Sequence, residues 1–143
     1  MTRPGFAARH PRLFHLLPAE AWTSFERRGL LSAAALCDLY AVPAERRPAL
    51  LEEDRGKGNF VSLSAPDLPD VSLRDQLLPD ALLLRCLTGG YAGRPAAWRG
   101  LLNGLVFLWA DRRRVAKLHG ASRARPGAAT PGLAPGRGAR RTP

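Results

Sequence analysis

Short apolar runs separated by proline- and glycine-rich turns set the pattern of this chain. An uninterrupted apolar run of four or five residues is typical of a buried strand, and alternation is typical of a strand with one exposed face. Leu105–Trp109 is the most continuous run and predicts a buried strand. The other predicted strands are Leu13–Leu17, Phe60–Leu63 and Val71–Arg74.

Helices are predicted between these runs from their start and stop residues. Ser32 and Asp111 are suited to cap a first helical turn, and Gly29 is suited to end a helix in the left-handed conformation. Residues 1–12 are polar and contain proline, which predicts a loose lead-in. The predicted helices cover residues 18–28, 32–40, 47–54, 79–87, 95–102 and 111–118.

The pattern predicts an α+β fold that is helix-rich, with few short strands. Residues 13–120 are expected to form a single α+β domain. Residues 121–143 carry Leu133 as their only large apolar side chain, so we expect them to be a disordered basic Ala/Gly/Pro/Arg tail that forms no strand. A domain with so few strands and none to follow is expected to be incomplete.

The net charge divides between the predicted domain and the tail. The chain has 143 residues, with 22 Lys plus Arg against 12 Asp plus Glu, which gives a formal net charge of +10. Five of the arginines and no acidic residue lie in residues 121–143, so half of the net charge belongs to the tail. Two hypotheses for the tail stay open: an arm that contacts nucleic-acid phosphates nonspecifically, or the product of a shifted reading frame in a GC-rich gene.

Composition also excludes several protein classes. No apolar run reaches the ~18 residues of a membrane-spanning helix, and the first residues lack the apolar core of a signal peptide. Cys37 and Cys86 alone can neither staple a fold nor complete a zinc site. We therefore expect a cytoplasmic protein with no bound metal and no membrane partner. The sequence does not indicate an oligomeric state.

Three separated blocks agree in order with one family. Over residues 13–121 the chain resembles an uncharacterised bacterial domain family, a domain of unknown function. The blocks that carry the resemblance are Trp22–Tyr40, Val71–Pro79 and Trp98–Trp109.

A more distant likeness concerns the first two blocks. A strand that carries a histidine, followed by a helix that ends in Gly-Leu, resembles the opening of ADP-ribosyltransferases of the DNA-modifying toxin type. The resemblance implies NAD as the cofactor, with His15 contacting a ribose hydroxyl and Arg74 holding the cofactor. The family's late catalytic glutamate has no counterpart, because no Asp or Glu follows Asp111. The resemblance therefore implies a truncated, inactive relative that binds NAD at most.

Each candidate residue also has a structural interpretation. His15 would be a core histidine paired with a backbone carbonyl, and Arg74-Asp75-Gln76 would form a local salt bridge with a turn-facing amide. Asn103 would cap the helix beside Gly104. Lys57, between two glycines, predicts a turn, because the spacing of a phosphate-binding loop is absent.

The remaining chemistry-bearing residues are expected to be structural. Arg112–Arg114 would be a solvated face, with a nucleic-acid contact as the alternative. The aromatic residues Trp98, Phe107 and Trp109 are predicted to be core residues, and both cysteines to be inert buried thiols. No paired carboxylates or nucleophile–base motif indicates another enzyme class. A small noncatalytic nucleic-acid-binding protein is therefore the alternative function.

Overall fold

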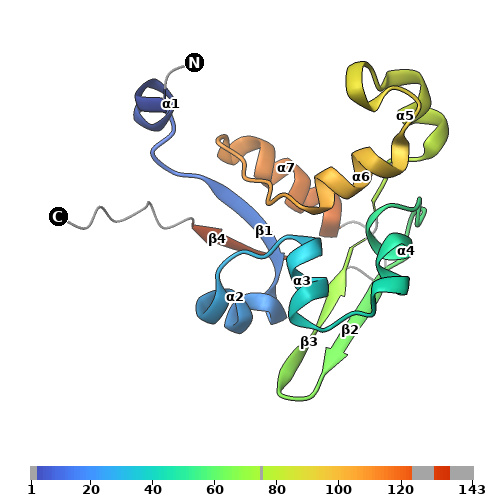
Figure 1. Ribbon diagram of the computed structural model, residues 1–143. Helices are drawn as coiled ribbons and strands as arrows, with labels where there is room; N and C mark the ends of the chain where they lie inside the picture. The colour runs from blue at the N-terminus through green and yellow to red at the C-terminus, as the bar shows by residue number, and fades with distance from the viewer. Residues whose placement is uncertain (1–2, 75, 124–130, 136–143) are drawn as a thin grey trace. The chain divides into compact units, whose positions relative to one another are not determined.

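The computed structural model describes residues 3–74, 76–123 and 131–135, and it has the α+β class predicted from the sequence (Figure 1). The chain divides into two compact units. Unit 1 combines residues 1–27 with residues 107–143, and unit 2 is the continuous segment 28–106. Unit 1 is thus built from both ends of the chain.

Unit 1 is organised around strand β1. This strand pairs antiparallel with β4, with Phe14 opposite Pro135 and Leu16 opposite Leu133. Helix α7 packs on β1, and its residue Val115 is 1% exposed. The elements are α1 (Arg3–Arg9), β1 (Phe14–Pro18), η1 (Ala19–Ala21), α2 (Trp22–Arg28), α7 (Arg112–Arg123) and β4 (Pro131–Pro135).

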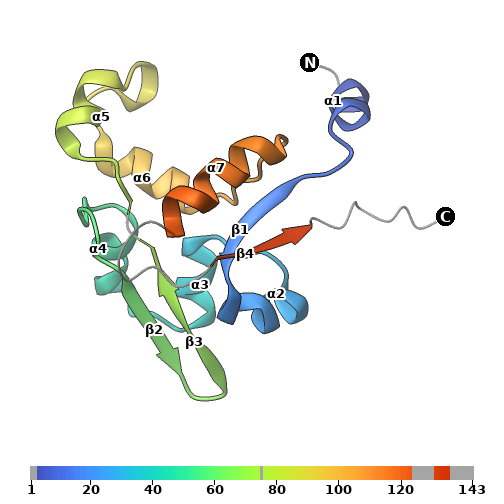
Figure 2. The same cartoon turned by 180° about the vertical axis from the view of Figure 1, so that it is seen from behind.

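Unit 2 is built on a hairpin with helices beside it, as Figure 2 shows from behind. Strands β2 and β3 pair antiparallel, with Val61 opposite Leu73, and the turn between them holds Asp67 at φ +52°. The elements are α3 (Ala33–Leu39), η2 (Ala44–Arg46), α4 (Arg47–Leu51), β2 (Val61–Ala65), β3 (Leu68–Leu73), α5 (Asp80–Cys86), η3 (Gly89–Tyr91) and α6 (Pro95–Asn103).

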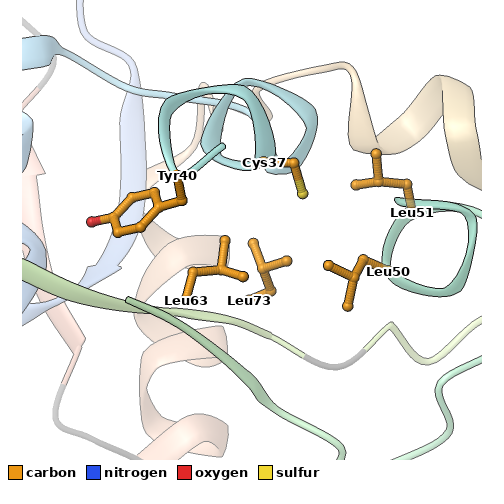
Figure 3. Packing of buried hydrophobic residues seen from close by; sticks show 6 residues of the cluster. All are labelled: Cys37, Tyr40, Leu50, Leu51, Leu63 and Leu73. Carbon is orange, nitrogen blue, oxygen red and sulfur yellow. The ribbon is translucent and has the colours of Figure 1, made fainter. Parts of the chain in front are cut away.

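The core of unit 2 lies between the hairpin and helices α3 and α4 (Figure 3). Leucines from each strand of the hairpin meet leucines of α4 and the inward side chains of α3. The Tyr40 hydroxyl, at the end of α3, donates to the carbonyl of Pro69 in β3 and so fixes this helix to the hairpin. The buried cluster consists of Cys37, Tyr40, Leu50, Leu51, Leu63 and Leu73.

Local signals in the sequence placed several element boundaries correctly. The Ser32 hydroxyl accepts from the Ala35 amide at 3.1 Å and caps α3. Asp111 accepts from the Arg113 amide at 2.8 Å at the start of α7. Gly29 follows α2 at φ +76°, a left-handed conformation that suits glycine.

The ends of the chain differ from the prediction. The loose lead-in expected over residues 1–12 contains helix α1. Helix α7 continues to Arg123, and residues 131–135 form β4, so the prediction that the tail forms no strand is wrong for this segment. The other predicted tail residues, 124–130 and 136–143, lie outside the described residues.

The pairing geometry explains how a proline-rich segment forms β4. Phe14 uses its own amide and carbonyl on the opposite edge of β1, where both bond to Trp109. The β4 partners of Phe14, Leu16 and Pro18 therefore occupy non-hydrogen-bonded positions, because hydrogen-bonded pairs alternate along an antiparallel ladder. Two of these positions are the prolines of β4, which lose no ladder bond there.

The buried strand predicted over Leu105–Trp109 is not present. The segment follows α6 as an irregular stretch and makes one β-bridge, between Trp109 and Phe14. The next position of that ladder would have the Leu16 amide donate to the Phe107 carbonyl. The Phe107 carbonyl instead lies 2.8 Å from Nδ1 of His15, and the segment makes no second bridge among the described residues.

Candidate functional site

His15 lies in β1 with its imidazole held by the backbone. Its Nδ1 is 2.8 Å from the carbonyl oxygen of Phe107, and its ring centroid is 6.4 Å from that of Trp109. Because a carbonyl only accepts, Nδ1 carries the proton, and in the neutral ring Nε2 is then an acceptor. This hydrogen bond is the pairing with a backbone carbonyl that the structural interpretation of His15 predicts. The half-buried ring keeps a second nitrogen for another partner.

Arg74 follows β3 in unit 2. Its main-chain carbonyl accepts from Arg55 Nη2 at 2.6 Å, and its side chain is half-buried. His15 belongs to unit 1, so the structure defines no common site for the two residues proposed to contact NAD.

A chain of side-chain amides follows Arg74. Gln76 Nε2 donates to Asn103 Oδ1 at 2.8 Å, and Asn103 Nδ2 donates to the carbonyl of Leu51 at 2.6 Å. No group among the described residues donates to the buried Gln76 Oε1. Asp75, which completes the predicted Arg-Asp-Gln motif, lies outside the described residues. The structure therefore joins two sequence candidates, Gln76 and Asn103, at the end of helix α4.

Arg99 completes this polar cluster and was missed by the sequence analysis. The residue is 1% exposed; its Nη1 donates to the Glu52 carbonyl at 2.9 Å, and its Nη2 pairs with the Asp80 carboxylate. Arg99 lies one turn before Asn103, so both face α4 from one side of α6. That spacing of four is a signal in the sequence, although an arginine on a helix is usually solvated.

The cluster of Arg99, Asn103 and Gln76 has a clear structural task. Leu51 and Glu52 lie at the C-terminal end of α4, where carbonyls lack partners within the helix. A cation and an amide donor there satisfy those oxygens and favour the negative end of the helix dipole. Within the described residues, no group of three or more His, Cys, Asp or Glu side chains could hold a metal ion.

Residues 11–131 match a family of unknown function (DUF7002). The chain belongs to this family. No curated protein and no solved structure matches it. The expected likeness to an uncharacterised family is thus confirmed, and the DUF7002 match spans both units of the structure.

Other candidates in the DUF7002 region have mixed outcomes. Gly56 and Gly58 flank Lys57 at φ +67° and +82°, consistent with the predicted turn. Cys37 is buried, and burial raises the pKa of its thiol. Cys86 is exposed, so its predicted burial is wrong; it lies on α5 with its side chain in solvent.

The predicted aromatic core is also only partly present. Trp98 packs edge-on against Tyr91, with ring centroids 5.1 Å apart. Phe107 is 49% exposed, so its assignment to the core is wrong, because the strand expected to bury it does not form. Arg112–Arg114 are all exposed, as predicted for a solvated face. No helix in the described part of the chain is long and apolar enough to cross a membrane.

Proposed function

We propose that this DUF7002 member is a noncatalytic, ADP-ribosyltransferase-like domain that binds NAD through His15. The observation that carries the proposal is the hydrogen bond of His15 Nδ1 to the Phe107 carbonyl. This bond fixes the ring orientation and makes Nε2 an acceptor, which suits the hydroxyl of a nicotinamide ribose.

The acidic residues of the chain support the noncatalytic part of the proposal. Cleavage of the bond to nicotinamide develops positive charge on the sugar and requires a fixed negative charge nearby. Asp111 is the acidic residue nearest to Phe107 in the sequence, and its carboxylate is engaged as the cap of α7. We therefore expect NAD binding without transfer of ADP-ribose.

A titration of the full-length protein with NAD, followed by calorimetry or by amide chemical shifts, tests the binding. His15→Ala should weaken NAD affinity by about three- to tenfold, the range for loss of one neutral hydrogen bond. The variant His15→Asn keeps a donor for the Phe107 carbonyl and loses the acceptor at Nε2. It should therefore fold normally and bind NAD as weakly as His15→Ala does. His10→Ala is the matched control, since His10 stacks on Phe6 at a centroid distance of 4.8 Å. Equal affinity in all variants, or no NAD binding, would overturn the proposal.

Incubation with labelled NAD and DNA, RNA or protein tests the absence of catalysis. We expect no label on any acceptor. Label transfer that disappears in His15→Ala would show that the domain is a transferase.

The second candidate is nonspecific nucleic-acid binding, favoured by the exposure of Arg112–Arg114 on α7. Three phosphate contacts predict a slope of about −2.7 in log affinity against log salt for duplex DNA. Arg137→Gln, Arg140→Gln and Arg141→Gln together, which leave the β4 sequence intact, should weaken this binding further if the basic tail contributes. Binding that is absent or insensitive to salt would eliminate this candidate.

A further inference from the structure

Four consecutive apolar side chains are exposed between α6 and α7. Leu105 is 47% exposed, Val106 37%, Phe107 49% and Leu108 44%. We refer to residues 105–108 as the apolar loop. Single exposed leucines are common on protein surfaces, but a contiguous exposed run of this kind marks an interaction site.

Three exposed arginines, Arg112–Arg114, follow the apolar loop after three residues. We refer to them as the arginine cluster. The only acidic residue between the two segments is Asp111, whose carboxylate accepts from the Arg113 amide at 2.8 Å. Lys117, one turn later, is also exposed. The partner of this segment should therefore combine negative charge with an apolar phase.

The exposure pattern decides between partners. A groove on a folded protein takes side chains from one face of a strand or helix, at spacings of two or of three to four residues. The apolar loop exposes four neighbours in succession, which suits a fluid apolar phase. Pairing with a second copy would bring like-charged arginine clusters together, and nucleic acid offers no environment for three aliphatic side chains.

We propose that residues 105–114 are an interfacial membrane-binding segment that recognises anionic lipid. The apolar loop enters the boundary between headgroups and acyl chains, and the arginine cluster contacts the lipid phosphates and carboxylates. The segment lies in the interface and does not span the bilayer. This inference is independent of NAD binding. It replaces the sequence-based expectation of no membrane partner, which rested on the absence of a membrane-spanning run and of a signal peptide.

Both ends of the apolar loop are anchored. On the side of α6, Gly104 donates to the carbonyl of Gly100 at 3.2 Å and ends the helix. On the side of α7, the amide and carbonyl of Trp109 bond to Phe14 at 2.9 and 2.8 Å. These bonds fix the residue before the loop within unit 2 and the residue after it within unit 1.

Co-sedimentation of the full-length protein with lipid vesicles tests the proposal. Vesicles of phosphatidylcholine with phosphatidylserine should bind the protein, vesicles of phosphatidylcholine alone should bind it weakly, and high salt should reduce binding to the former. Arg112→Gln, Arg113→Gln and Arg114→Gln together should weaken binding by about 100-fold, at roughly fivefold for each arginine near an anionic surface. The matched control changes three exposed arginines elsewhere to glutamine: Arg27, Arg46 and Arg85.

A second pair of variants tests the apolar contribution. Phe107→Ser with Leu108→Ser should weaken binding by about tenfold or more, since two inserted side chains are lost. Leu82→Ser with Leu84→Ser is the control, because these leucines of α5 are 37% and 54% exposed. Circular dichroism establishes that every variant is folded.

Two results would overturn the proposal. One is the absence of binding to anionic vesicles. The other is salt-sensitive binding to both vesicles and DNA that depends on the arginine cluster but is unchanged in the double variant Phe107→Ser with Leu108→Ser. That result would make the segment a nucleic-acid contact.

Discussion

Asn103 Nδ2 lies 2.6 Å from the main-chain oxygen of Leu51, so the last residue of α6 closes the last turn of α4. Arg99, one turn earlier, does the same for the carbonyl of Glu52 at 2.9 Å. Two segments about fifty positions apart in the chain are thereby joined through side-chain donors and backbone acceptors. The stability of unit 2 should depend strongly on both residues.

Asn103→Ala should lower the free energy of unfolding by about 1–3 kcal/mol, because it leaves the Leu51 carbonyl without its donor in a buried position. Chemical denaturation followed by circular dichroism measures the effect. Asn59→Ala is the control, since Asn59 donates to a backbone carbonyl in an exposed turn. Similar losses in both variants would show that burial of the Asn103 bond is unimportant.

Asp80→Asn should destabilise the fold by about 2 kcal/mol, because it leaves the buried Arg99 cation without its counter-ion. The loss stays below the ~3–5 kcal/mol of a fully buried pair, since the Asp80 side chain is 58% exposed. Combining Asp80→Asn with Arg99→Met should cost less than the sum of the two single variants. Additive losses in this double-mutant cycle would contradict a coupled pair.

Stability should fall at alkaline pH. Burial raises the pKa of the Tyr40 hydroxyl above 10.0 and that of the Cys37 thiol above 9.0 in the folded protein. As pH rises past these ordinary values, the unfolded chain loses protons that the folded chain retains, so unfolding becomes more favourable.

Denaturation at about pH 8 and about pH 10.5 measures this decline in stability. These two pH values bracket the ordinary pKa values of a thiol and a phenol. Tyr40→Phe should reduce the difference between the two conditions, although it also removes the bond to the Pro69 carbonyl and lowers stability at both. An equal pH dependence in Tyr40→Phe and the parent protein would refute the linkage.

Gly29→Ala should cost about 1 kcal/mol, because alanine is strained in the left-handed conformation. The added methyl would meet no atom within 4 Å, so the loss would come from the backbone at φ +76°. Gly90→Ala has equally open space without a left-handed φ and should change stability by less than about 0.5 kcal/mol. Thermal or urea unfolding of the two variants separates these cases.

The parts of the fold that follow from local chemistry were predictable from the sequence. The short apolar run of β1 and the caps at Ser32 and Asp111 act through neighbouring residues, and the structure has all three. His15 paired with a backbone carbonyl was likewise one of the two interpretations of that residue.

The parts that depend on distant partners were not predictable. Leu105–Trp109 has strand composition, but apolar character does not specify which strand will pair with it, and the segment makes only one bridge, to Phe14, among the described residues. The shortage of large apolar side chains in residues 121–143 argued against β4. Its prolines are tolerated because of their register opposite β1. Burial of Arg99 could not be predicted, because the carbonyl that it satisfies belongs to a segment far away in the sequence.

The division of unit 1 between the two ends of the chain affects how the protein is made. Strand β1 emerges from the ribosome early, whereas its partner β4 is more than one hundred residues later in the chain. Unit 2 is continuous over residues 28–106 and is complete before β4 is translated. The edge of β1 that pairs with β4 therefore stays unpaired until β4 has emerged from the ribosome. We expect this edge to be the part of the nascent chain most in need of a chaperone.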